Sequence, residues 1–119
     1  MKLLTQSIRE RLIRNGVLSV QFAEERRQEP DFIPVVKLFT PDGACTWLLT
    51  ELDPNDEHIA FGLCDLSMGF PELGSVRISE LEAVRGKLGL PIERDRFFHP
   101  DKTLSDYAEQ ARLAGAIKA

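Results

Sequence analysis

The stretch that decides the fold runs from Lys37 to Pro54 and reads KLFTPDGACTWLLTELDP. Two runs with apolar residues at alternating positions flank Thr40-Pro41-Asp42-Gly43. Proline presets the first dihedral angle of a turn and glycine tolerates positive φ, so this stretch predicts a β-hairpin with a three-residue loop and a glycine bulge. The second run, Ala44 to Leu52, is apolar on both faces, which favours a central position in a sheet.

Further strands are predicted on the C-terminal side of this hairpin. Asp53 to Asp56 has turn chemistry, and His58 to Leu66 is an apolar run that we expect to join the same sheet. Ser67 to Gly74 contains a proline and two glycines and indicates a loop. Two short segments are further strand candidates: Ser75–Ile78 and Ile92–Phe98.

Helices are predicted outside this strand-rich region. Gly16 is placed to end the first helix, and Ser79-Glu80-Leu81-Glu82 has the pattern of a capping box that opens the second. Leu81, Val84 and Leu88 would share the buried face of that second helix. Residues 17–33 show short strand-like alternation followed by polar residues, which indicates a variable loop or insertion. The predicted helices are Thr5–Asn15, Ser79–Leu88 and Thr103–Ala114.

Together these elements predict one α+β domain across residues 1–119, with a central antiparallel-rich β-sheet and about three peripheral helices. The net charge of −4 disfavours a general nucleic-acid binder. No apolar run approaches the roughly 20 residues of a membrane span, and no signal-peptide core follows Met1, so we expect a cytoplasmic protein. Cys45 and Cys64 lie in apolar runs, which is typical of buried thiols.

Charge is distributed unevenly along the chain. From Leu38 to Val76 there is no lysine or arginine, so the central region is acid-only. We expect this region to present a negative face that meets a cation or a basic surface. The stretch contains these carboxylates: Asp42, Glu51, Asp53, Asp56, Glu57, Asp65 and Glu72.

Other chemistries are weaker alternatives. A metal site for nuclease chemistry could use Asp53, Asp56, His58 and Asp65, although turn chemistry explains the first two as well. A nucleophilic cysteine with His58 or His99 as base lacks any recognised spacing. Bases could stack on the aromatic pair Phe97 and Phe98 beside two arginines, but acidic residues interleave with the cations there. The arginines are Arg94 and Arg96.

Three blocks of the sequence resemble one known family. They are Lys37–Pro54, IAFGLCDLSMGFPELGSV at Ile59–Val76, and SELEAVRGKLGLPIERD at Ser79–Asp95. The sequence is similar here to a family of small bacterial proteins of unknown function that are often encoded on plasmids, conjugative elements and phages. The resemblance implies an accessory protein of mobile DNA and carries no catalytic residue with it.

The function that we expect is therefore non-catalytic binding of a protein partner, with no cofactor or metal. An acidic surface could inhibit a host nuclease or a restriction or CRISPR component by occupying its basic groove. A small metal-dependent enzyme acting on nucleic acid is the alternative, and direct nucleic-acid binding is less favoured. The predicted contact residues are six carboxylates and one apolar anchor in the 67–74 loop: Asp42, Glu51, Asp53, Asp56, Glu57, Glu72 and Phe70.

Overall fold

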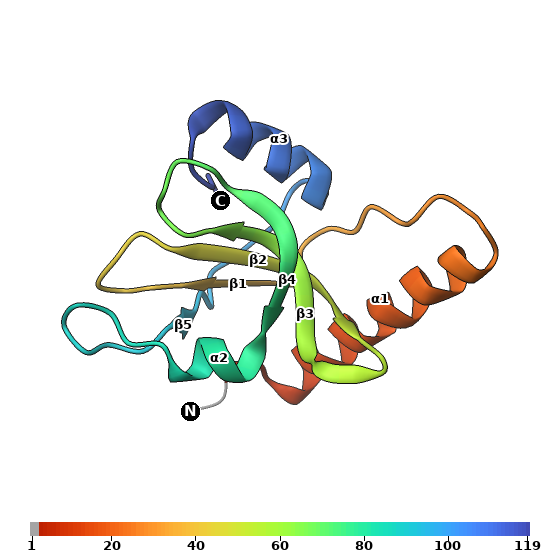
Figure 1. Ribbon diagram of the computed structural model, residues 1–119, viewed down its shortest axis with the longest axis horizontal. Coiled ribbons are helices and arrows are strands. Elements are labelled where there is room, and N and C mark those ends of the chain that lie inside the picture. The colour runs from red at the N-terminus through yellow and green to blue at the C-terminus, as the bar shows by residue number, and fades with distance from the viewer. Residues whose placement is uncertain (1–2) are drawn as a thin grey trace.

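A computed structural model describes residues 3–119 and shows a five-stranded antiparallel sheet with three helices in that range (Figure 1). The strand order is β4-β3-β2-β1-β5, so β4 and β5 are the two edges. This architecture confirms the predicted α+β fold with one sheet. The elements are α1 (Gln6–Glu24), β1 (Val36–Phe39), β2 (Thr46–Asp53), β3 (Asp56–Asp65), β4 (Glu72–Arg77), α2 (Ile78–Ala83), β5 (Glu93–Arg94) and α3 (Leu104–Ala114).

The β1–β2 hairpin is present, with Phe39 opposite Thr46 at its closed end. Its loop differs from the prediction. The amide of Gly43 donates to the carbonyl of Thr40 at 3.3 Å, and the amide of Cys45 donates to the Thr40 hydroxyl at 2.9 Å. Gly43 does not have positive φ, so the predicted glycine bulge is wrong. The Thr40 hydroxyl stabilises a connection of six residues, 40–45, instead.

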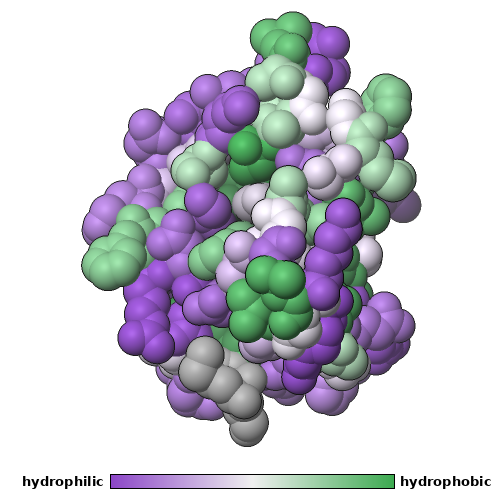
Figure 2. All heavy atoms as spheres, turned by 90° about the vertical axis from the view of Figure 1, so that its left-hand side faces the viewer, coloured by the Kyte–Doolittle hydropathy of each residue, from purple (hydrophilic) through white to green (hydrophobic). Residues whose placement is uncertain are grey.

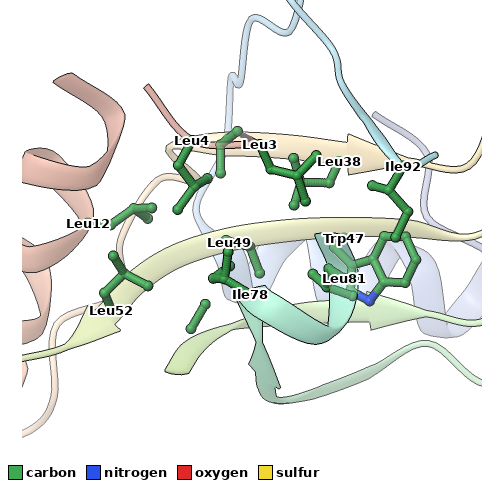
Figure 3. Packing of buried hydrophobic residues seen from close by; sticks show 12 residues of the cluster. Leu3, Leu4, Leu12, Leu38, Trp47, Leu49, Leu52, Ile78, Leu81 and Ile92 are labelled. Carbon is green, nitrogen blue, oxygen red and sulfur yellow. The ribbon is translucent and has the colours of Figure 1, made fainter. Parts of the chain in front are cut away.

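The sheet separates two apolar clusters. On one face, α1 and α2 pack on β1, β2 and β3, and Figure 3 shows Leu12 of α1 beside Leu52 of β2. On the other face, α3 packs on β2 and β3 through Tyr107 and Ala111. Neighbouring residues of β2 serve both clusters, because successive side chains of a strand point to opposite faces. Leu48 faces α3, whereas Leu49 faces α1 and α2.

Helix α1 continues for two turns beyond the predicted end, so the strand-like alternation noted in residues 17–33 is helical as far as Glu24. Gly16 does not end the helix. It lies against β2, where an added Cβ would overlap the carbonyl oxygen of Leu52. The side-chain amide of Asn15 also donates to the carbonyl of Thr50 at 2.9 Å. The glycine therefore serves close packing of helix on strand, and residues 25–35 form an irregular connection.

Helix α2 is shorter than predicted, because a tight loop over residues 85–91 replaces its second half. The amide of Gly86 donates to the carbonyl of Leu90 at 2.9 Å, and Gly89 has a φ of 79°. Leu81 is buried as predicted, but Val84 is 38% exposed and Leu88 is 80% exposed, so the predicted apolar face is wrong at both positions. Ser79 lies within the first turn and is not the N-cap residue, which is Arg77.

Helix α3 begins and ends where the sequence predicts, with Thr103 at the N-cap position and Gly115 in the left-handed conformation at the C-cap. The capping side chain is Asp31, whose Oδ1 accepts from the amide of Ser105 at 3.1 Å. The carbonyl of Phe32 accepts from the amide of Leu104 at 2.8 Å. The connection after α1 therefore docks on the start of α3.

Both edge strands differ from their predicted bounds. Strand β4 begins at Glu72, so the last part of the predicted loop pairs with β3. Strand β5 is only two residues long. Cys45 and Cys64 are half-buried thiols, and burial raises the pKa of Cys64. None of the helices in residues 3–119 combines the length and apolar character that a membrane span requires.

Candidate partner-binding site

The carboxylates of the acid-only stretch do not share one face. Asp42 lies in the β1–β2 loop, at the opposite end of β2 from Asp53. Asp56 and Asp65 are the first and last residues of β3, so about 30 Å of strand separates them at roughly 3.3 Å per residue. The metal-site alternative could use some of Asp53, Asp56, His58 and Asp65, and this separation places Asp65 out of reach of the others. Within residues 3–119, no group of three or more His, Cys, Asp or Glu side chains is arranged to hold a metal ion.

Asp42 holds two loops together. Its Oδ2 accepts from the amide of Leu88 at 2.7 Å and from the amide of Leu90 at 3.4 Å. Gly86 lies directly against the same carboxylate, and an added Cβ there would overlap it. Its other oxygen, Oδ1, is buried and has no hydrogen-bond partner in the described residues. Asp42 is therefore engaged within the molecule, which leaves little of it for the partner contact that we predicted.

Asp65 is also internal, with 3% of its surface exposed. One oxygen accepts from the amide of Ser67 at 2.9 Å, and the other accepts from the amide of Ile117 at 3.0 Å. The carboxylate thus connects the end of β3 to the segment after α3. It stabilises the fold and does not contribute to an acidic surface.

Apart from Glu72 at the start of β4, the remaining carboxylates gather around the β2–β3 hairpin. Asp53 accepts from the amide of Asn55 at 2.8 Å within the two-residue loop, and Asp56 forms an ion pair with Arg77 at 3.7 Å. Glu57 and Asp53 are exposed, whereas Glu51 is half-buried. Four of the predicted contact carboxylates therefore lie together at this hairpin: Glu51, Asp53, Asp56 and Glu57.

A pocket of about 420 Å³ opens beside this hairpin, between the second half of α1 and the strands β2, β3 and β4. Three carboxylates line it: Glu29 from the connection after α1, and Glu51 and Asp53 from β2. Ser19 of α1 and Ser75 of β4 line it as well. Sequence reasoning found Glu51 and Asp53 but missed Glu29 and Ser19, because it placed residues 17–33 in a loop that did not belong to the site.

The electrostatics of the pocket are dominated by unbalanced negative charge. Burial raises the pKa of Glu51, the nearby carboxylates Glu29 and Asp53 raise it further, and the Ser19 hydroxyl lowers it in part. Within residues 3–119, no lysine, arginine or histidine forms an ion pair with any of the three. A cation entering this pocket would relieve their repulsion. The pocket can therefore accept a positively charged group.

The apolar anchor predicted in the β3–β4 loop is exposed. Phe70 is 79% exposed, and Met68 in the same loop is 69% exposed. Glu72, at the start of β4, is exposed too. The end of the molecule shown in Figure 2 carries its hydrophobic side chains as separate patches among hydrophilic ones.

The residues considered for base stacking are divided by the fold. Phe97 is 85% exposed, but Phe98 is half-buried against the α3 cluster. Arg94 donates to the carbonyl of Leu3 at 2.6 Å, which ties it to the N-terminal segment. These side chains do not form one stacking platform.

The structure is that of a small α+β protein with a pocket lined by three carboxylates, whose charge is complementary to a cation. A family model with the description "Protein of unknown function (DUF2958)" matches residues 3–118, and the chain belongs to this family. Comparison with curated proteins and with solved structures finds no significant match.

Proposed function

We propose that this protein is a non-catalytic module that binds a protein partner by accepting a lysine or arginine side chain in the pocket of Glu29, Glu51 and Asp53. The observation that carries the proposal is that three carboxylates line one pocket and none of them has an ion-pair partner within residues 3–119. Burial raises the pKa of Glu51 in the same direction, since half-buried negative charge without a basic neighbour is destabilising. A partner's cation would offset that cost in the bound state. Charge in and around the pocket would also steer a basic partner and raise the association rate.

The proposed partner class follows from the same chemistry. Proteins that bind nucleic acid expose rows of lysine and arginine toward phosphates, and such a groove offers the cationic side chains that this pocket accepts. The resemblance noted above implies an accessory protein of mobile DNA. We therefore propose that the partner is a host nuclease or a restriction or CRISPR component, and that occupation of its basic groove is anti-defence activity.

The test compares capture of partners from a bacterial host lysate by three proteins. These are the wild type, the double variant Glu51→Gln/Asp53→Asn, and the control Glu57→Gln. Glu57 lies on the same hairpin but does not line the pocket. We expect a basic protein that the wild type and the control retain equally and the double variant loses. Equal recovery of every protein by all three would contradict the pocket as the binding site.

A further inference from the structure

Strand β4 offers an open edge to a partner. Within residues 3–119 its backbone pairs only with β3, over six consecutive residues and with no bulge in the register. The opposite edge, β5, has only two residues, which is too short to hold another strand firmly. Natural edge strands are usually shortened, bulged or covered to prevent pairing with other chains. Strand β4 has neither a bulge nor an internal lysine or proline.

One face of β4 leads into two hollows. Leu73 and Ser75 are two residues apart and point to the same face, where they lie opposite Leu63 and Phe61 of β3. Leu73 lines a groove of about 470 Å³ against α3, with Leu63 and Ala108 among its apolar walls. Ser75 lines the acidic pocket. A strand added beside β4 would therefore place alternate side chains above the groove and above the pocket.

The charge along this face of β4 indicates which kind of strand would be complementary to it. The two arginines here are already paired, Arg77 with Asp56 at 3.7 Å and Arg112 with Glu109 at 2.6 Å. Four carboxylates have no ion-pair partner within residues 3–119. They are Glu29, Glu51, Asp53 and Glu72. The excess is negative at both hollows, so a complementary strand carries positive charge.

We propose that β4 is extended by an antiparallel strand from the partner, with a lysine or arginine opposite Ser75 and an apolar residue two positions later opposite Leu73. This inference rests on the proposed function, since the cation is the one that the pocket accepts. Backbone hydrogen bonds to β4 supply affinity, and the alternate side chains supply specificity. Glu51 of β2 lies opposite Phe61 of β3, which in turn lies opposite Ser75, so a long cationic chain above Ser75 would extend across Phe61 toward Glu51.

The probe is the peptide acetyl-Thr-Thr-Arg-Thr-Leu-Thr-Thr-amide, titrated into the full chain labelled with ¹⁵N. We expect amide shifts to concentrate in Glu72–Arg77, and the outward amides of β4 to become protected from hydrogen exchange. The reversed peptide, acetyl-Thr-Thr-Leu-Thr-Arg-Thr-Thr-amide, has the same composition but exchanges the two side chains. It should bind about fivefold or more weakly.

Methylation of peptide amides separates strand pairing from charge. Methyl groups on the alternate amides that face β4 should weaken binding about tenfold or more, whereas methyl groups on the intervening amides should have little effect. Leu73→Ala and Glu51→Gln should each weaken binding about fivefold, and Glu57→Gln should not. The two glutamate substitutions are isosteric, and Glu51→Gln and Glu57→Gln differ only in whether the charge lies in the pocket.

The outcomes distinguish the two proposals. If Glu51→Gln weakens binding but methylation of either set of amides does not, the cationic pocket stands and strand addition at β4 is wrong. If methylation blocks binding and Glu51→Gln has no effect, strand addition stands without the cation, and the proposed function fails. Absence of shifts in β4 with either peptide at about 1 mM would overturn strand addition.

Discussion

Gly16 of α1 lies directly against the carbonyl of Leu52 of β2, so close that a Cβ at this position would overlap the oxygen. The nearest atom of Pro54 would be 3.2 Å from the same Cβ. Both neighbours are backbone or ring atoms with little freedom to move. The contact allows α1 to continue past the end of β2, and it thereby brings Ser19 to the acidic pocket.

We expect Gly16→Ala to destabilise the fold by about 1–3 kcal/mol, because the helix must move away from β2. Chemical denaturation followed by circular dichroism measures this difference. Gly74→Ala is the matched control, since no atom lies within 4 Å of a Cβ added at that position. Equal midpoints for the wild type and Gly16→Ala would show that the close contact is not needed.

Asp31 should supply the capping carboxylate of α3 from a distant part of the chain. Its carboxylate accepts from the amide and the hydroxyl of Ser105. Asp31→Ala should cost about 0.5–2 kcal/mol at neutral pH. Thr103→Ala should cost less, since Thr103 makes no side-chain cap bond within residues 3–119.

The cap should also depend on pH. Slight burial raises the pKa of Asp31, but the hydrogen bonds from Ser105 and Thr103 outweigh it and leave the pKa below the ordinary value of 3.8. The stabilisation is therefore present above that value and is lost as the pH falls through the lowered pKa. Stability of the wild type and Asp31→Ala should converge in acid. A constant difference down to the acid transition would argue against an ionised cap.

The contribution of Glu51 to stability should depend on pH in the opposite direction to that of Asp31. Burial and the carboxylates of Glu29 and Asp53 raise its pKa above the ordinary value of 4.5. The folded state is therefore favoured while Glu51 is protonated, and this contribution is lost as the pH rises through the raised pKa. Glu51→Gln should gain stability relative to the wild type between acid and neutral pH. Parallel curves of stability against pH in the two proteins would mean that Glu51 is not strained when ionised.

Asp65 should be the most important carboxylate for stability, because it is buried and accepts from two backbone amides of distant segments. Asp65→Asn replaces one acceptor by a donor, and we expect a loss of about 1–3 kcal/mol in thermal or chemical denaturation. Glu72→Gln, on the exposed edge strand, should stay within about 0.5 kcal/mol of the wild type. A neutral effect of Asp65→Asn would refute its internal role.

The sheet could be predicted from sequence because period-two alternation and turn residues are local signals. The apolar runs around Trp47 and from His58 to Asp65 lie in the same sheet as predicted, in neighbouring strands. The features that were missed depend on contacts between distant residues. Asp42 holds residues 85–91 in a loop from more than forty positions away, which ends α2 early. Ser79 has no capping role because α2 begins at Ile78, directly after β4.

The pocket could be predicted only in part for the same reason. Glu51 and Asp53 belong to a hairpin with clear sequence signals, so their neighbourhood was predictable. Glu29 joins them because α1 continues through Gly16 and its connection returns to α3 at Asp31. A glycine after a helical pattern usually indicates the end of the helix. No local feature of the sequence distinguishes it from a glycine inside a helix that allows close packing. The carboxylates of the acid-only stretch do not form one surface, because Asp56 and Asp65 lie at opposite ends of β3.

The most direct test of the central claim is the dissociation constant of the captured partner with the wild type and with Glu51→Gln/Asp53→Asn, measured by calorimetry at two salt concentrations. We predict that the double variant weakens binding at least about tenfold and that its affinity depends less on salt, while Glu57→Gln binds like the wild type. Equal affinity and equal salt dependence for the wild type and the double variant would contradict the account.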